Sequence, residues 1–357
     1  MAEYILKHVT LEGRITDITI DTESGRILST QPTDRAGREM DGAEVVAGFV
    51  DIHAHGFCGY DVMDGNRLSE MSAFLAKEGI TAWCPTTTTN ALPELRAVLD
   101  SPLPKAGAAV LGFHLEGPYI SHRYCGALNT DHARCPDPAD FAGLEDRIAL
   151  MTLAPELEGA MAYIDQAPFP VSLGHTAADY ACAREAFRRG ACCVTHIFNA
   201  MAPLHHREPA VVGAALTENA FVQVICDGIH LHPAVILALY RMFGSERMIL
   251  ISDAISATGL CDGDYMLGGK AVLVRDGVAR NEAGALSGST VTLSECVRRA
   301  VSFGIPREDA LKMASATPAA FLGVNKGKIA PGYDADILVV DKNLNVCETI
   351  LSHTLHP

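Results

Sequence analysis

The sequence predicts a (β/α)8 TIM-type barrel with a small β-sandwich domain formed by the N- and C-terminal segments. The first observation is a repeated pattern, in which a short apolar run ends in a polar cluster and a helix-like stretch follows. Eight such runs occupy residues 45–55, 80–89, 109–116, 148–155, 170–176, 192–199, 221–230 and 248–253. Continuous apolar strands that alternate with helices indicate a parallel sheet covered on both faces. Eight units are the number that closes a barrel.

The second observation concerns the turn after the first run. An open doubly wound sheet would need a glycine-rich phosphate turn there. The sequence has His53-Ala-His-Gly56 instead, which favours the barrel. One connecting helix is clear at residues 180–190, where the apolar spacing is helical and Gly190 suits a C-terminal cap.

The two ends of the chain have a different pattern. Residues 1–48 alternate as strands do, and residues 326–342 also read as β structure. We therefore expect residues 1–48 and 326–357 to form the small β domain, and residues 49–325 to form the barrel. Residues 262–285 contain two glycine-bearing turns and predict a β-hairpin insertion.

Composition limits the possible functions. The 357 residues carry a net charge of −15 without any run of Lys or Arg, which argues against nucleic acid as a partner. The sequence contains no stretch of roughly 18 apolar residues, so no membrane span is predicted. The first residues do not resemble a signal peptide. Eleven cysteines without a repeating spacing are typical of free thiols. We expect a cytoplasmic protein.

Ligand-type residues stand at the ends of five of the predicted strands. Because the carboxyl ends of barrel strands meet at one mouth, these side chains should lie together. His53 and His55 should also face the same side, since strand side chains alternate. The set consists of His53, His55, Glu116, His175, His196 and Asp253.

Each of these residues has an ordinary structural alternative. His175 and His196 could be buried core histidines, and Asp253 could be a helix N-cap. Together they predict a metal site. Nitrogen and oxygen ligands without a thiolate favour Zn²⁺ or Fe²⁺, with Mn²⁺, Co²⁺ or Ni²⁺ as further options. One or two divalent metals could bind, since Glu116 could bridge two.

The same set predicts a reaction class. A bound divalent ion lowers the pKa of water and polarises a carbonyl, which suits hydrolysis of a C–N bond. A neighbouring carboxylate can take a proton from the water and pass it to the leaving amine. Asp253 is the candidate for this general base and acid.

A second cluster concerns the substrate. His206, Arg207 and His230 would form a positive patch at the mouth of an otherwise acidic protein. Arginine suits phosphate because its planar group donates two hydrogen bonds. The alternative is that Arg207 pairs with Glu208 or another surface carboxylate.

Several motifs together resemble the N-acetylglucosamine-6-phosphate deacetylase family of the amidohydrolase superfamily. They are His53-Ala-His, His114-Leu-Glu-Gly-Pro, Gly174-His-Thr, Thr195-His-Ile-Phe-Asn-Ala-Met, His205-His-Arg-Glu-Pro, Asp227-Gly-Ile-His, Ser252-Asp-Ala, Leu286-Ser-Gly-Ser-Thr and Gly332-Tyr-Asp-Ala-Asp. The resemblance covers nearly the whole chain. It implies removal of the acetyl group of the sugar phosphate, which gives glucosamine 6-phosphate and acetate.

The resemblance also implies roles for individual residues. Glu116, His175 and His196 would bind the main metal, His53 and His55 a second one, and Asp253 would be the base and acid. Further residues would form the substrate site, with Arg207 and His230 nearest the phosphate. These are Ala127, Leu128, Asn199, Ala200, Arg207, Asp227, Gly228, Ile229, His230, Leu286, Ser287 and Gly288. Members are usually homodimers, with the phosphate end of the site near the subunit interface.

One position departs from the family pattern. Leu128 stands where many members carry a polar residue, often His or Gln, and it cannot hydrogen-bond the acetamide carbonyl. Either a second metal polarises the carbonyl, or the preferred N-acyl sugar differs. The alternative functions are a deacetylase of another N-acetylhexosamine phosphate, a cyclic amidase, a hydrolase of N-acyl amino acids, and an inactive scaffold that only binds partners.

Overall fold

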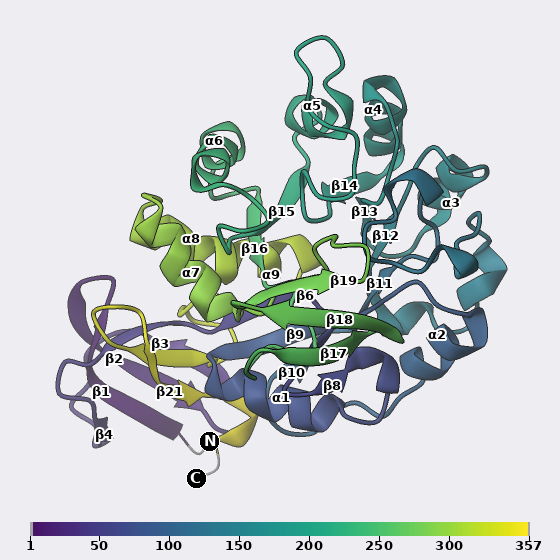
Figure 1. The fold of residues 1–357 in the computed structure, drawn as a ribbon. Coiled ribbons are helices and arrows are strands. Elements are labelled where there is room, and N and C mark those ends of the chain that lie inside the picture. Colours follow the sequence, from purple (N-terminus) through teal and green to yellow (C-terminus); the bar gives the residue numbers. More distant parts are fainter. Residues whose placement is uncertain (1–2, 356–357) are drawn as a thin grey trace.

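The computed structural model describes residues 3–355, and its centre is a nearly closed barrel of eight parallel strands (Figure 1). In barrel order these are β6 (Phe49–Ala54), β9 (Ile80–Thr87), β11 (Phe113–Glu116), β12 (Ile148–Leu153), β13 (Val171–Leu173), β14 (Ala191–Val194), β15 (Phe221–Ile225) and β16 (Met248–Ile251). A parallel bridge between Ala54 and Ala254 links the last strand end back to the first. The predicted barrel is confirmed.

Burial explains why the strand sequences are apolar throughout. Every residue of β6, β9 and β16 is buried, because the barrel interior lies on one side and the helices on the other. The interior is filled by small and branched side chains, among them Val50, Ile52, Ile225 and Ile251. This packed interior is a rigid base for the residues at the strand ends.

Helices cover the outside of the barrel. They are α1 (Leu68–Lys77), α2 (Leu92–Leu99), α3 (Ala160–Gln166), α4 (Tyr180–Arg189), α5 (Ala210–Thr217), α6 (Pro233–Phe243), α7 (Leu293–Ser302), α8 (Arg307–Ala314) and α9 (Ala316–Leu322). The predicted helix at 180–190 is α4. Asp179 caps its start by accepting a hydrogen bond from the backbone of Cys182, and Gly190 ends it.

The third connection differs from the repeated pattern, because it contains no α-helix. Between β11 and β12 the chain forms only short 3-10 turns, η2 (His122–Tyr124), η3 (Thr130–His132), η4 (Pro138–Phe141) and η5 (Glu145–Arg147). Pro118, Pro136 and Pro138 lie in this segment and disfavour a continuous helix. The predicted run 109–116 is itself interrupted, with β10 (Ala109–Val110) pairing with β9 before β11 begins.

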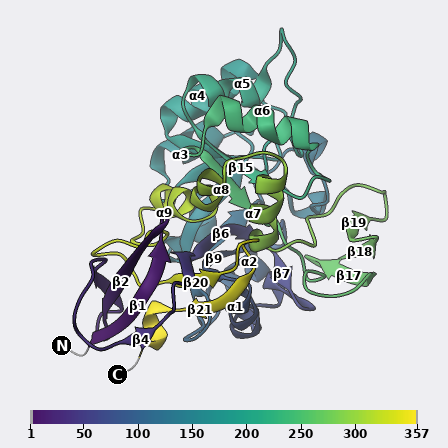
Figure 2. The same cartoon turned by 90° about the vertical axis from the view of Figure 1, so that its left-hand side faces the viewer.

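The two termini form one separate sheet beside the barrel (Figure 2). Its strands are β1 (Glu3–Leu11), β2 (Arg14–Asp21), β3 (Arg26–Ser29), β4 (Arg38–Glu39), β5 (Glu44–Ala47), β20 (Ile337–Val340) and β21 (Val346–Ile350). Their inward side chains share a core of their own, with Leu6, Ile18, Ile20 and Ile337 at its centre. The C-terminal strands join the N-terminal ones through β20 and β5.

The predicted run 45–55 belongs to two different sheets. Its first part is β5 of the terminal sheet, and its second part is β6 of the barrel. Gly48 lies between them, where a Cβ atom would come within 2.3 Å of Thr81 Oγ1. Only glycine allows the chain to pass this close to β9. The division into residues 1–48 plus 326–357 and residues 49–325 stays a prediction.

A small antiparallel sheet projects near the barrel mouth, between β16 and α7. It consists of β17 (Gly263–Leu267), β18 (Lys270–Arg275) and β19 (Val278–Asn281), which form two successive hairpins. Leu267 and Val272 pack against Ile255 in the loop after β16. A further short pair, β7 (Gly56–Phe57) and β8 (Tyr60–Asp61), precedes the turn η1 (Val62–Asp64), and η6 (Ser352–Thr354) follows β21. Within residues 3–355, no helix combines the length and the apolar character that crossing a membrane requires.

Candidate metal centre and active site

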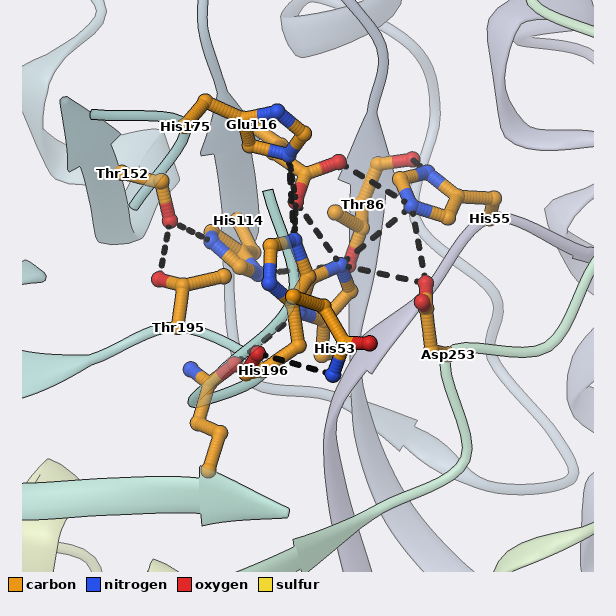
Figure 3. Close-up of polar contacts among 12 residues, drawn as sticks. His53, His55, Thr86, His114, Glu116, Thr152, His175, Thr195, His196 and Asp253 are labelled. Carbon is orange, nitrogen blue, oxygen red and sulfur yellow. Dashed lines mark hydrogen bonds and ion pairs between the residues drawn. The ribbon is translucent and has the colours of Figure 1, made fainter. Parts of the chain in front are cut away.

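The six predicted ligand residues meet at the carboxyl ends of the barrel strands (Figure 3). They form two groups, each with its ligand atoms within 4.8 Å of one another. One group is His53, His55 and Asp253, and the other is Glu116, His175 and His196. All six side chains are buried. The strand ends therefore bring together residues that are up to 200 positions apart in the sequence.

Glu116 lies between the two groups. Its Oε1 atom is 2.9 Å from His196 Nε2, 3.1 Å from His175 Nε2 and 3.4 Å from His53 Nε2. Its Oε2 atom is 3.3 Å from His55 Nε2. The carboxylate thus contacts histidines of both groups.

The Nδ1 atoms of three of these histidines are held by contacts on the side of the ring away from the centre. His55 Nδ1 donates to the carbonyl of Thr86 at 3.1 Å, and His175 Nδ1 donates to the carbonyl of Cys125 at 3.1 Å. His53 Nδ1 lies 2.9 Å from Gln223 Oε1. These contacts leave Nε2 of each ring free to face the centre, which is the arrangement of metal-binding histidines.

The backbone at the strand ends is unusual. His175, His196 and Asp253 have φ angles of 47°, 27° and 49°, in the left-handed region that residues with a side chain rarely adopt. Strain of this kind is concentrated at functional sites, where the surrounding structure holds it. Here it turns three ligand residues inward directly after their strands end.

The charges of the site favour a cation. Burial raises the pKa of Glu116 and Asp253, but the neighbouring histidines outweigh burial and hold both pKa values below the usual range. Burial lowers the pKa of His55, yet Asp253 and Glu116 raise it to about 10. The two buried carboxylates therefore attract positive charge to this position.

A divalent metal fits these residues. Nitrogen and carboxylate oxygen atoms are the donors that Zn²⁺ and Fe²⁺ accept. The ring nitrogens of His53 and His55 lie 3.2 Å apart, and those of His175 and His196 lie 3.0 Å apart. Such pairs need a shared cation or proton, because two imidazole lone pairs repel each other at this distance.

Below the ligands lies a polar layer that sequence reasoning missed. His114 Nε2 is 2.7 Å from Thr152 Oγ1, which is 2.7 Å from Thr195 Oγ1. The His114 ring stands edge-on to His53, with ring centroids 4.5 Å apart. Burial lowers the pKa of His114 well below its ordinary value, so the ring is neutral. The alternation of strand side chains could have found it, since His114 shares a strand face with Glu116.

Five of the six candidate ligands, all except the fully buried His53, line the floor of a cavity of about 260 Å³. Seven of the predicted substrate residues line it, namely Ala127, Leu128, Asn199, Ala200, His230, Leu286 and Gly288. Leu267, from the small antiparallel sheet, also lines it and was not predicted. Its contribution could not be read from the sequence because it depends on how the insertion folds over the mouth.

The other predicted substrate residues lie outside the cavity wall. Asp227 is behind His230, and Ser287 is buried with its backbone bonded to Ala279. Arg207 is exposed in the loop after β14, where its guanidinium lies 2.6 Å from His206 Nε2. Gly228 and Ile229 belong to the turn between Asp227 and His230. Their contacts with substrate stay predictions.

His230 is held by Asp227. Asp227 Oδ2 accepts a hydrogen bond from His230 Nδ1 at 2.6 Å, and Oδ1 accepts from the backbone N–H groups of Ile229 and His230. Burial lowers the pKa of His230, but Asp227 outweighs burial and raises it. Nδ1 of His230 thus faces Asp227, and the residue lines the cavity.

Known proteins resemble this chain over nearly its whole length. The amidohydrolase family model matches residues 45–354. N-acetylgalactosamine-6-phosphate deacetylase from Escherichia coli O157:H7 is 36% identical over 95% of this chain and 94% of its own. N-acetylglucosamine-6-phosphate deacetylase from Vibrio furnissii is 37% identical over 93% and 88%.

Solved structures agree with these relatives. A variant of N-acetyl-D-glucosamine-6-phosphate deacetylase from Mycobacterium smegmatis, in complex with N-acetyl-D-glucosamine-6-phosphate, superposes with a TM-score of 0.90 at 32% identity and covers 99% of both chains. The Thermotoga maritima enzyme of the same name gives 0.88 at 32% identity over 98% of both chains. With a family model that matches most of its length and such relatives along nearly all of it, the chain belongs to the amidohydrolase family.

Proposed function

We propose that this enzyme hydrolyses the N-acetyl group of N-acetyl-D-glucosamine 6-phosphate, giving D-glucosamine 6-phosphate and acetate. The observation that carries the proposal is the pair of ligand groups joined by Glu116 on the floor of the cavity. The names of the relatives supply the substrate class. A cyclic amidase or a hydrolase of N-acyl amino acids is not favoured, since the relatives that are 36% and 37% identical over 95% and 93% of this chain are sugar-phosphate deacetylases.

Glu116, His175 and His196 would hold one divalent metal, and His53, His55 and Asp253 would hold the second. A bound divalent cation lowers the pKa of water and polarises the amide carbonyl. Zn²⁺ or Fe²⁺ suits the donor set best, with Mn²⁺, Co²⁺ or Ni²⁺ as further options. An inactive scaffold is not favoured, since all six positions keep a ligand-type side chain.

Asp253 would move the proton. Its carboxylate lines the cavity, and Oδ1 is 3.2 Å from His55 Nε2. Ionised Asp253 accepts a proton from the attacking water as the new C–O bond forms. It then donates that proton to the amine nitrogen as the C–N bond breaks. The acetyl carbon leaves as acetate, and the amine remains on the sugar.

The sugar phosphate would be held by the cavity wall and the adjoining loops. His230, fixed by Asp227, would lie near the phosphate. Asn199 and Ala200 also line the cavity. Arg207 lies on an exposed loop and would meet the phosphate at the outer end of the site, near the interface of a homodimer.

The free thiols support a cytoplasmic enzyme. Among residues 3–355, all eleven cysteines are free.

A substrate panel tests the function. Release of acetate should be measured with N-acetylglucosamine 6-phosphate, N-acetylgalactosamine 6-phosphate and unphosphorylated N-acetylglucosamine. The glucosamine phosphate should give the highest kcat/KM, and loss of the phosphate should lower kcat/KM at least tenfold, about the worth of one charged hydrogen bond. Equal turnover with and without the phosphate would refute the assignment.

A further inference from the structure

Glu156 makes two short hydrogen bonds directly beside a metal ligand. It follows β12, and its Oε2 atom accepts a hydrogen bond from Thr176 Oγ1 at 2.5 Å. Its Oε1 atom accepts from the backbone N–H of Ala177, also at 2.5 Å. Both partners immediately follow His175 in the chain. One carboxylate therefore fixes the segment that carries this ligand.

The same segment is joined to the next loop of the barrel mouth. Thr176 is fully buried, and its N–H donates to the carbonyl of Ala200 at 3.2 Å. Its carbonyl accepts from the N–H of Ala202 at 3.3 Å. Ala200 lines the cavity. Through Thr176, Glu156 is thus connected both to the metal centre and to the wall that faces the substrate.

Both loops have strained backbone, one at the candidate metal ligand His175 and the other at the cavity residue Ala200. His175 has a φ angle of 47° and Ala200 one of 48°, in the left-handed region. Neither residue is glycine, so this conformation persists only where surrounding contacts hold it. Hydrogen bonds to an ionised carboxylate are roughly twice as strong as neutral ones. Glu156 is the charged group that supplies them here.

We propose that Glu156 is a positioning residue, which acts through Thr176 to keep His175 and Ala200 in one fixed geometry. It touches neither the cavity nor the ligand atoms. The effect of Glu156 on binding of the sugar phosphate rests on the proposed function. The effect of Glu156 on retention of the metal does not. Loss of the carboxylate should loosen the metal ligand and the substrate wall together.

The test compares Glu156→Gln and Glu156→Ala with the wild type and with a matched control. The control is Glu158→Ala, an exposed glutamate two residues further on. Glutamine keeps one oxygen acceptor and loses the other, while alanine loses both. Each full-length protein is loaded with Zn²⁺, and release of Zn²⁺ to a coloured chelator is followed at 25 °C. KM, kcat and the melting temperature are measured on the same samples.

Zn²⁺ release should be about tenfold faster in Glu156→Ala, the lower end of the effect of groups that orient metal ligands. The release rate of Glu156→Gln should lie between those of Glu156→Ala and the wild type. KM should rise in the same order, from wild type through Glu156→Gln to Glu156→Ala. Glu158→Ala should match the wild type in both the release rate and KM. If Glu156→Ala does not fold, Glu156→Gln alone decides. Wild-type release and KM in the folded variants, even with a lower melting temperature, would overturn the proposal. Should the wild type fail to hydrolyse the sugar phosphate, Zn²⁺ release still decides the role of Glu156.

Discussion

Asp253 and His53 are in contact through both their backbones and their side chains. The N–H of Asp253 donates to the carbonyl of His53 at 3.0 Å, and Asp253 Oδ1 lies 3.4 Å from His53 Nε2. The end of the eighth strand is therefore attached to the first strand, at the point where the barrel closes. The candidate base is thus in contact with a candidate metal ligand from the opposite end of the barrel sequence.

Asp253→Asn should keep the fold and lose nearly all activity. Asparagine preserves the shape and the backbone bond to His53, but its amide cannot accept the proton from water. We expect kcat to fall by on the order of 10²- to 10⁴-fold, the usual contribution of a general base. The checks are kcat at saturating substrate, metal content and the melting temperature. Asp264→Asn, at a side chain that is 84% exposed, is the matched control. Near-normal turnover in Asp253→Asn would remove this residue from the mechanism.

The two ligand groups predict two divalent ions per chain. His53 and His55 belong to only one of them, so His53→Asn/His55→Asn should bind a single ion. Elemental analysis of protein dialysed against Zn²⁺ should give a ratio near two for the wild type and near one for the double variant. His122→Asn, at an exposed histidine of η2, should not change the ratio. Two ions retained by the double variant would show that the pair is not a metal site.

Leu128 lines the cavity but offers no hydrogen bond to the substrate. If the second metal compensates by polarising the acetamide carbonyl, a polar side chain at this position should matter only after His53 and His55 are removed. We expect Leu128→Gln to change kcat/KM little in the wild type. In the His53→Asn/His55→Asn background, Leu128→Gln should raise kcat/KM about tenfold, the worth of one good hydrogen bond.

Leu128→Met is the control for this comparison, because it conserves volume without adding a hydrogen-bond donor. Leu128→Met should not raise kcat/KM in the His53→Asn/His55→Asn background. An equal gain from Leu128→Gln in both backgrounds would show that the metal pair and residue 128 act independently.

The positions of the candidate metal ligands could be predicted because they follow simple local rules. Strand alternation places His53 and His55 on one face, and parallel strands in a barrel bring His175, His196 and Asp253 to one mouth. These rules need only the positions of the strand ends. The apolar runs located the strand ends closely enough, and the six residues lie together at the barrel mouth as expected.

What the sequence did not predict depends on contacts between distant segments. Leu267 reaches the cavity only because the small antiparallel sheet packs on Ile255. Glu156, in the loop after β12, accepts a hydrogen bond from Thr176, in the loop after β13. The missing helix after β11 and the passage of the chain at Gly48 depend likewise on neighbours that local periodicity does not reveal.

Asp17 predicts a loss of stability in acid that originates in the terminal sheet. Burial raises the pKa of this carboxyl, but hydrogen bonds from Lys7 Nζ and from the backbone of His8 and Thr33 outweigh burial and lower it to about 2. The pKa in the unfolded chain is about 4. Stabilisation is therefore complete above roughly pH 5 and is lost as the pH falls towards 2.

Lowering the pKa of Asp17 from about 4 in the unfolded chain to about 2 in the folded protein corresponds to roughly 2 to 3 kcal/mol in the free energy of unfolding. Urea unfolding of the wild type between pH 6 and pH 2.5 should show most of this decrease. Asp17→Asn cannot titrate, so its unfolding free energy should start lower at pH 6 and fall less steeply. Asp34→Asn, at an exposed aspartate of the same sheet region, should follow the wild type. If Asp17→Asn kept the full acid dependence, that dependence would have to arise from other carboxyl groups, and the Lys7–Asp17 pair would not be its source.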